Sequence, residues 1–493
     1  MGLSSLCVEA ANTVKAPENS ALTPTGTLPV LCIVTDPALL DKDIDDKVYR
    51  DGGYWLEVPE GSEFEAIGSS ESPLPLQIKT RGNWTRRAFS KKPFKIKLAE
   101  KQPMLGLSKS KHFVLMAHAD DRLAFLRDHM AFWTARQLEL PWAPSDQAIE
   151  LVINGDYRGL YFVTESIRVE KDRVNITELN DNEETPELCS GGYIVEIDNE
   201  TEPNQIYFDD WGHELPLTFE APEEYSEIQK RFITDQFTKI NDLIHAHDPE
   251  LWSYLDLDML ARYYIVQEVI DNQEMFNGST FIYRDRGKDQ KWIFSPVWDF
   301  GSSFYRDYGE AMFCHEQTFF YNFWIKDILT TEGFSKKVAE TWNWAGGEKL
   351  SGFSAEAARY VANLESAAKR DGDRWRGCPV PVYAYAGTVA DNSDIHPIHE
   401  RYMSLYNRKR TFLMNQWGVP ADTPEPARDQ TIAAELPAYL DPDSGIDDVE
   451  EGSPEGSAQK TYSIHGYRVN PDDNLPGGIY IVTDQKGKRK EIR

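Results

Sequence analysis

Short runs of alternating apolar and polar residues mark the first part of the chain, and this period of two is typical of β-strands. Residues 74–80 and 94–98 are two such runs. The second places three apolar side chains on one face and Lys95 and Lys97 on the other. A continuous apolar run at residues 28–34 predicts a strand that is buried on both faces.

Further strands and then helices follow along the chain. Two β-rich runs flank Asn154-Gly155, a pair of residues that favours a hairpin turn, and residues 191–198 read as another strand. A helix beginning near Asp120 or Asp121, either of which could cap it, is predicted next to the hairpin. Apolar residues at helical spacing predict the later helices over 223–247, 256–270, 355–370 and 394–417. The order predicts an α+β body of two lobes over residues 28–418, β-rich first and mainly helical second.

The two ends of the chain have a different composition. Residues 419–460 are rich in Pro, Asp, Glu, Gly and Ser, so we expect a solvated acidic linker there. Residues 461–493 predict a small β-unit with a strand at Ile479–Val482 and a basic end. The first 27 residues lack the basic and apolar regions of a signal peptide, and we interpret them as a disordered segment or the remnant of a signal.

Composition and charge narrow the function. The chain has 493 residues, and its formal net charge of −29 disfavours nucleic acid as the main partner, because such a surface repels phosphate backbones. Its apolar runs are far shorter than the roughly 18 residues that span a membrane. The five cysteines are scattered and form no CxxC pair, which favours neither a disulfide framework nor a zinc site.

The densest positive cluster lies on and before the second of the two strands. Its members are Arg81, Arg86, Arg87, Lys91, Lys92, Lys95 and Lys97. A lysine face beneath a glycine-containing loop can hold phosphate, although a solvated strand face would have the same pattern. Upstream, Asp41, Asp43 and Asp45 are spaced as in a calcium loop, but the later Gly and Glu are missing, so we interpret the segment as an acidic loop.

An acid- and amide-rich loop follows the helix predicted over 256–270. Its side chains include Asp271, Asn272, Glu274, Asn277 and Ser279. A hairpin over 281–297 then leads to Trp298-Asp299-Phe300-Gly301. Phosphoryl transfer needs an acid near the accepting hydroxyl, oxygen ligands for Mg²⁺ and cations on the phosphates, and protein kinases place these segments in this order. The residues alone leave open that the acids cap helix ends and that Trp298 is a core anchor.

Several motifs in series carry a family resemblance. The segments are RGNWT, KKPFKIKL, LMAHADDRLAFLRDHMAFWTAR, VINGDYRGLYFVTESI, GGYIVEID and PVWDFG. In this order they resemble the CotH kinases, atypical kinases related to spore-coat protein H, over roughly residues 28–412. The resemblance implies a divergent, two-lobed protein-kinase-like fold. It also implies an enzyme that uses ATP and Mg²⁺ or Mn²⁺ to phosphorylate Ser or Thr of secreted or cell-surface proteins.

The resemblance assigns roles by position in the second lobe. Asp299 matches the metal-binding Asp, and Ser279 falls near a metal position that is often Asn. Glu274 stands where the N-x-D motif has its catalytic Asp, and Asp271 is near enough to substitute. Glu in place of Asp moves the carboxylate outward by about 1.5 Å, a displacement that can cost ~10²-fold in rate.

The same resemblance assigns the nucleotide contacts to the first lobe. Lys95 or Lys97 would contact the phosphates, and Glu165 would orient the lysine. Arg81 and Asn83 match the RGN loop of the family and are expected to bind ATP.

Two other functions are compatible with the sequence. The Glu274 and Ser279 departures motivate a kinase-like surface protein that binds or supports without turnover. A carbohydrate-active protein is a weaker option, based on the 12% aromatic content and the abundant carboxylates. We expect a monomer.

The end of the chain resembles a known export signal. GIYIV followed by Lys and Arg is similar to the C-terminal sorting domain of the Bacteroidetes type IX system. The resemblance implies a bacterial protein that is secreted or held at the cell surface.

Overall fold

A computed structural model of the chain describes residues 22–40, 44, 46–199, 204–305, 307, 309–317, 320–378 and 389–420, with four short strands between residues 460 and 492. The chain divides into two compact units, Met1–Thr431 and Ile432–Arg493. Three predictions lie outside the described residues, wholly or largely. They concern the first 27 residues, the acidic loop at Asp41, Asp43 and Asp45, and the linker over 419–460.

The β-rich first part is a closed barrel of seven strands within the described chain. The strands are β1 (Val30–Thr35), β2 (Arg50–Glu57), β3 (Leu74–Thr80), β4 (Phe94–Met104), β5 (Leu107–Met116), β6 (Asp146–Ile153) and β7 (Asp156–Glu165). Their order around the barrel is β1-β2-β3-β4-β5-β7-β6, and a parallel pairing of β1 with β6 closes it, with Leu31 opposite Leu151. The sequence predicted β1, β3, β4, β6 and β7 but neither β2 nor β5, and closure depends on pairing between residues more than 100 positions apart.

The alternation along β3 and β4 separates the inside of the barrel from its outer face. Ile78 lies opposite Ile96, and both are fully buried in the apolar cluster that fills the barrel. Lys79 lies opposite Lys95 on the other face. Apolar burial thus fixes the register, and the register fixes where these lysines stand.

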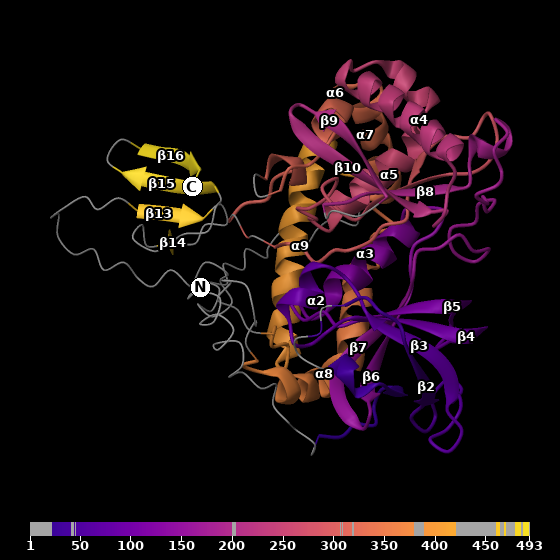
Figure 1. Cartoon of the computed structure of the whole chain (residues 1–493). Coiled ribbons are helices and arrows are strands. Elements are labelled where there is room, and N and C mark those ends of the chain that lie inside the picture. The colour runs from indigo at the N-terminus through magenta and orange to yellow at the C-terminus, as the bar shows by residue number, and fades with distance from the viewer. Residues whose placement is uncertain are drawn as a thin grey trace, which may run out of the picture. The chain divides into compact units, whose positions relative to one another are not determined.

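An antiparallel sheet and helices form the second part of the first unit. The sheet has the order β12-β11-β8-β10-β9, from β8 (Tyr193–Ile197), β9 (Gln205–Asp210), β10 (His213–Ala221), β11 (Thr280–Arg284) and β12 (Ile293–Phe294). The helices of the described chain are α2 (Trp84–Ala88), α3 (Leu126–Gln137), α4 (Glu227–His245), α5 (Leu257–Val269), α6 (Ile325–Thr330), α7 (Phe334–Ala345), α8 (Phe353–Trp375) and α9 (Ile395–Trp417). Figure 1 shows α3 between the barrel and the helical part, with α9 running beside both.

The helix predictions were correct in place and differ at the ends. α4 begins after Ser226, whose side chain forms a capping box with Gln229, and α5 begins after Asp256, which accepts from Met259 N. The expected cap of α3 was wrong, because that helix begins only at Leu126. Asp121 instead accepts from Leu123 N at 2.7 Å and holds the turn that precedes the helix. α6 and α7 were not predicted.

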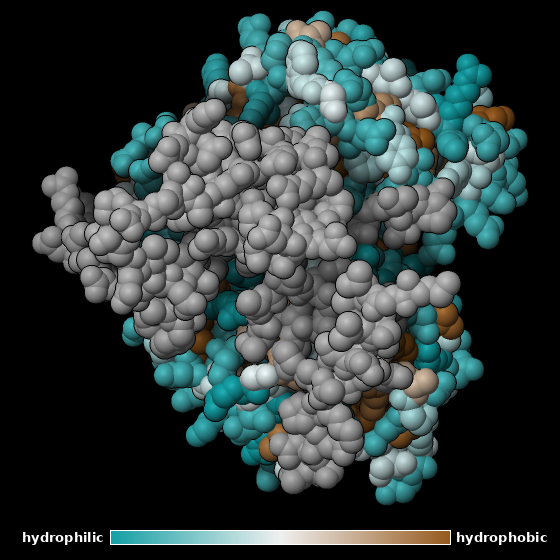
Figure 2. Space-filling model, turned by 60° about the vertical axis from the view of Figure 1, so that its left-hand side comes forward, coloured by the Kyte–Doolittle hydropathy of each residue, from teal (hydrophilic) through white to brown (hydrophobic). Residues whose placement is uncertain are grey.

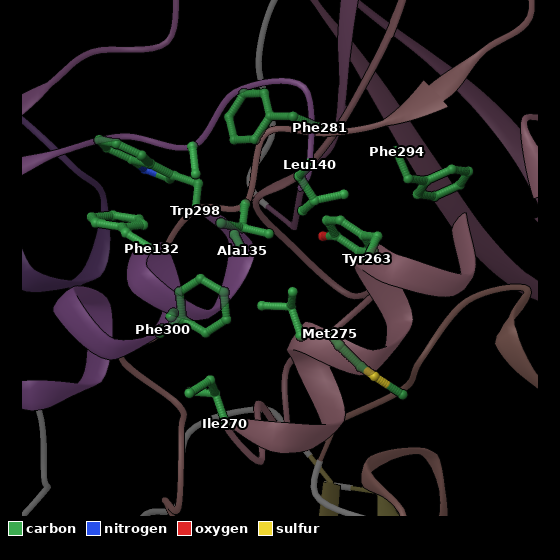
Figure 3. Close-up of a cluster of buried hydrophobic side chains, with 14 of the residues drawn as sticks. Phe132, Ala135, Leu140, Tyr263, Ile270, Met275, Phe281, Phe294, Trp298 and Phe300 are labelled. Carbon is green, nitrogen blue, oxygen red and sulfur yellow. The ribbon is translucent and has the colours of Figure 1, made fainter. Parts of the chain in front are cut away.

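A cluster of aromatic and aliphatic side chains lies where α3, α5 and the segment after β12 meet. The ring of Phe132 on α3 stacks against Trp298 with centroids 6.1 Å apart and contacts Phe300 edge-on. Figure 3 shows these rings beside Tyr263 of α5 and Met275. Trp298 and Phe300 therefore anchor the chain on either side of residue 299.

A buried histidine joins three elements of the first unit. His129 of α3 has its Nδ1 2.8 Å from Asp146 of β6 and its Nε2 2.9 Å from Glu356 of α8. Its ring stacks on Tyr360, whose hydroxyl donates to Asp146 at 2.6 Å. Burial lowers the pKa of His129, but the two carboxylates outweigh this and raise it overall. The imidazolium therefore links the barrel to two helices.

The surface of the described residues is polar, and the second unit contains a small β-sheet. The described surface in Figure 2 is mainly hydrophilic, with scattered apolar residues. No helix among the described residues is long and apolar enough to cross a membrane. In the second unit, β13 (Lys460–Ser463), β14 (Arg468–Val469), β15 (Ile479–Asp484) and β16 (Gly487–Ile492) form a sheet of order β14-β13-β15-β16. β15 covers the strand predicted at Ile479–Val482.

We expect His129→Gln to destabilise the first unit by about 3–5 kcal/mol at pH 6, because it leaves the buried Asp146 carboxylate without the cation that contacts it, whereas Glu356 keeps Arg359. The raised pKa of His129 makes its contribution complete below about pH 6.5 and lost as the pH rises through the folded-state pKa. Urea unfolding of wild type and variant between pH 6 and pH 9 measures both effects. His396→Gln, at an exposed histidine 3.4 Å from Glu365, is the control and should change little. Equal losses in both variants would contradict the linking role.

Candidate functional site

Asp299 is an exposed residue between two buried aromatic anchors. Its φ of 57° is left-handed, a conformation that Asp and Asn tolerate better than most residues. Because Trp298 and Phe300 point into the core, the carboxylate of Asp299 is turned outward. The sequence WDFG therefore presents one acid on a rigid base.

The start of α3 holds the Asp299 loop in place. Asp128 Oδ1 accepts from Phe300 N at 2.9 Å, and Arg127 donates to Gly301 O at 2.7 Å. A Cβ atom added at Gly301 would lie 3.3 Å from Asp299 Oδ1 and 3.7 Å from Asp120 Oδ2. The carboxylates of Asp299 and Asp120 thus both lie close to Gly301.

The acid- and amide-rich loop reaches the same place by pairing with the chain after Asp299. Phe304 N donates to Asp271 O at 3.1 Å, which aligns the two segments. Glu274 Oε2 then accepts from Ser302 Oγ at 2.7 Å, and its Oε1 accepts from Asn199 Nδ2 at 2.8 Å. These contacts fix the orientation of the Glu274 carboxylate.

The negative charge of Asp299 affects the acids around it. Burial, and after it the charge of Asp299, raises the pKa of Glu274 to about 7 and that of Asp128 to about 8. The pKa values of Asp120 and Glu196 are also raised, mainly by burial, with Asp299 among the acids that add to the effect. We call these five residues the Asp299 group. Such crowding of carboxylates is typical of a site that takes a cation.

The Asp299 group could supply only some of the ligands of a metal ion. Among the His, Cys, Asp and Glu side chains that the structure describes, three ligand atoms lie within 4.8 Å of one another only at Asp210, His245 and Asp327. The Asp299 group is therefore not a complete protein cage. It fits Mg²⁺, which is usually held by one or two carboxylates and completes its shell with water and phosphate oxygens.

Arg81 lies beside this group, and Lys95 of the barrel lies near Arg81. Arg81 follows β3, and its guanidinium lies 5.6 Å from the ring centre of Trp298. Its pKa is lowered by burial, against the opposing charges of Asp299, Asp128 and Glu196. Lys95 is half-buried, and no carboxylate among the described residues lies within 4.0 Å of its Nζ.

Lys95 stands in an unusually positive environment. Burial, and after it the neighbouring Lys79, Arg168 and Arg81, lowers its pKa to about 8, while Glu220 opposes the shift. Like charges directly opposite on paired strands destabilise a sheet, and Lys79 lies directly opposite Lys95. A bound anion would remove this cost.

The positive cluster of the sequence is divided by the fold. Lys91 is buried and pairs with Asp371 of α8 at 2.9 Å. Lys92 donates to Arg86 O, and Arg86 donates to Gly82 O at 2.9 Å, so both fasten the loop between β3 and β4. These three cations have protein partners, so of the basic segment only the strand lysines remain as the predicted phosphate face.

Other predicted site residues lie nearby with different surroundings. Lys97 is exposed and lies two residues after Lys95, on the same face of β4. Asn83 precedes α2 without capping it by its side chain, and its carbonyl accepts from Arg87. Ser279 lies near Glu196 and opposes the rise of its pKa, which places it beside the Asp299 group.

Two predicted residues have carboxylates engaged elsewhere. Asp271 lies 2.8 Å from Lys409 Nζ and accepts from Gln317 and Gln273. Glu165 accepts from the backbone N–H groups of residues 108 and 145, at 2.8 and 3.0 Å. The structure therefore does not bring Asp271 to the Asp299 group or Glu165 to Lys95.

The site includes acids that sequence reasoning did not assign to it. Asp120 and Asp128 belong to the segment LMAHADDRLAFLRDHMAFWTAR, where Asp120 was interpreted only as a helix cap. The only sequence feature that could have indicated their role is that they lie in this motif among apolar residues. Glu196 lies within the strand predicted over 191–198, and Glu220 enters through a bulge in β10 that no local pattern predicts.

Two comparisons with known proteins bear on this geometry. The sequence model of the family described as CotH kinase protein matches residues 78–396, which include the end of β3, all of β4 and the whole Asp299 group. No curated protein matches the chain.

We expect Asp299→Asn to raise the melting temperature of the metal-free protein by about 1–4 °C at pH 8, because it removes repulsion among neighbouring acids. Asn keeps the left-handed backbone and the acceptor for Gly301 N. The raised pKa values of Glu274 and Asp128 make wild-type stability fall as the pH rises toward about 7 and 8, and the variant should show a smaller fall.

Calorimetry in EDTA from pH 5 to pH 8 measures this effect. Asp289→Asn, at an exposed acid before β12, is the control and should leave the profile unchanged. A lower melting temperature for Asp299→Asn at pH 8 would mean that the Asp299 carboxylate is stabilising without a cation.

Proposed function

Because the chain belongs to the CotH kinase protein family, we propose that it transfers the γ-phosphoryl group of ATP to Ser or Thr of a secreted or cell-surface protein, with Mg²⁺ or Mn²⁺. The observation that carries the proposal is the opposition of charges at one place. Arg81 lies beside Asp299 and its neighbouring acids, and Lys95 lies in turn beside Arg81.

This opposition matches the chemistry of a metal-bound nucleoside triphosphate. Its phosphates are anionic and need cations, while its metal ion needs carboxylate oxygens. A protein with net charge −29 would repel a triphosphate unless a local positive site compensates. Lys95, with Lys79 and Arg168 beside it, supplies that site.

The residues divide the work as follows. Asp299 and Asp120 would hold the metal, whose role when bound is to neutralise charge on the phosphate oxygens. Arg81 and Lys95 would bind and orient the phosphates. Glu220 is the carboxylate that acts on Lys95, and it is therefore a better candidate than Glu165 to position this lysine.

Glu274 is the candidate base. In the transfer, the acceptor hydroxyl oxygen forms a bond to the γ-phosphorus, the bond from that phosphorus to the β-phosphate oxygen breaks, and ADP leaves. The hydroxyl proton passes to Glu274, which Ser302 and Asn199 hold in position. A pKa of about 7 suits a group that accepts a proton near neutral pH.

The proposed fold assignment follows the same division. We assign the barrel to the nucleotide-binding lobe of a divergent protein-kinase-like fold and the helical part to the lobe that carries the metal and the base. Asp271, paired with Lys409 of α9, would hold the loop of Glu274 against that helix. The C-terminal resemblance to a sorting domain favours export as the cellular context.

We expect ATP with Mg²⁺ or Mn²⁺ to raise the melting temperature of wild type by a few degrees, since ligand at about 100 times its Kd adds roughly 2.7 kcal/mol. Asp299→Asn should lose the metal-dependent part of this shift. Lys95→Met should weaken ATP binding at least about 10-fold, because it removes the central cation of the site. A thermal-shift titration in each metal measures these effects.

Lys97→Met is the matched control, since Lys97 is on the same strand face but exposed. It should bind ATP within about 2-fold of wild type. Binding by Asp299→Asn and Lys95→Met that equals wild type would overturn the site. The absence of any nucleotide shift in wild type would favour a binding or structural protein without turnover.

We expect Glu274→Gln to lower kcat by about 10²- to 10⁴-fold while the metal-dependent ATP shift remains, because the amide cannot accept the proton. Phosphorylation of a Ser/Thr-rich acceptor, or of the chain itself, followed with labelled ATP measures it. The wild-type rate should fall below about pH 7 as Glu274 becomes protonated, and the variant should lack this dependence. An unchanged kcat in Glu274→Gln would remove Glu274 from the mechanism.

A further inference from the structure

Three potential metal ligands meet at the end of the helical part, outside the Asp299 group. They are Asp210, the last residue of β9, His245, the last residue of α4, and Asp327 in α6. One ligand atom from each lies within 4.8 Å of the other two. Figure 1 shows β9, α4 and α6 gathered at this end of the first unit.

The geometry points to a second metal site, and we propose that Asp210, His245 and Asp327 bind a divalent ion of the zinc type. Ligands about 2.1 Å from one ion lie about 3.0–3.4 Å from each other, and His245 Nε2 lies 2.9 Å from Asp210 Oδ1. An imidazole with two carboxylates favours Zn²⁺ or a similar first-row ion over Mg²⁺ or Ca²⁺, which take oxygen ligands.

The surroundings orient these ligands. Asp210 is almost fully buried, and its Oδ2 accepts from Trp324 N at 3.1 Å. Asp327 Oδ2 accepts from Trp211 Nε1 at 2.6 Å, and its other oxygen lies 3.8 Å from Nε2 of His247, a second imidazole. Held carboxylates of this kind are a common feature of metal sites, because their partners fix the ligand direction. His245 and Asp327 keep some exposure, so an ion can enter from solvent.

The site is connected to the loop of Glu274 through a short strap over residues 321–324. Tyr321 OH donates to Asp210 O at 3.0 Å, and Trp324 N donates to its carboxylate. The middle of the strap contacts the loop, since Phe323 N donates to Phe276 O at 3.0 Å and Asn322 donates to the carbonyls of 273 and 275. An ion on Asp210 would therefore stabilise the support of this loop without touching nucleotide.

The experiment is isothermal titration of ZnCl₂ into the full chain, freed of metal with a chelator. The Asp299→Asn protein separates this site from the Asp299 group, and it should bind one equivalent. Adding Asp327→Asn or His245→Gln to that protein should weaken zinc binding at least about 100-fold, since each removes a direct ligand. Hydrogen exchange should show that zinc slows amide exchange in residues 321–325 of the Asp299→Asn protein.

The controls distinguish an ion site from a hydrogen-bonded cluster. Asp209→Asn changes the exposed acid next to Asp210 and keeps an acceptor for Gly212 N, so zinc binding should be unaffected. Circular dichroism in the presence of chelator shows whether each variant folds. Two ligand variants are made, so that the test can still be carried out if one of them does not fold. Zinc binding that is absent in Asp299→Asn, or equal in Asp299→Asn with and without the ligand substitutions, overturns the proposal. Neither outcome bears on ATP binding, which is measured separately.

Discussion

The repulsion among carboxylates around Asp299 is the constraint on which the candidate site depends. Burial and the charge of Asp299 together hold the pKa values of Glu274 and Asp128 far above their usual range. A chain free to move would separate these acids. Here the rings of Trp298 and Phe300 are fixed in the core, so the acids stay together and the cost is offset by packing elsewhere.

The barrel contributes a similar electrostatic repulsion, here between positive charges. Lys79 and Lys95 are brought face to face because Ile78 and Ile96 must both lie inside the barrel. The apolar register thus forces two like charges together on the outer face. Each half of the site is unfavourable by itself, and a ligand that carries both a metal ion and phosphates would relieve both.

Buried charges away from the site are paired, and they connect the parts. Lys91 pairs with Asp371, His129 with Asp146 and Glu356, and Lys409 with Asp271 and Glu268. These pairs join barrel strands to α8 and the α9 helix to the loop of Glu274. Lys95 and Asp299 differ from these, because neither forms an ion pair within 4.0 Å among the residues that the structure describes, and such charges are candidates for ligand binding.

The sequence by itself determined many of the local elements, though not α6 or α7, and it singled out the acid at Asp299. Alternation placed β3 and β4, helical spacing placed α4, α5, α8 and α9, and WDFG singled out Asp299, because these features depend on neighbouring residues. The tertiary structure decided which charges meet. Lys91 and Lys95 stand four residues apart in one basic segment, yet only packing against α8 makes the first structural, and Asp120 and Glu274 approach Asp299 only through contacts between distant segments. Barrel closure, the choice among lysines and the acids around Asp299 all depend on long-range pairing, which no local pattern encodes.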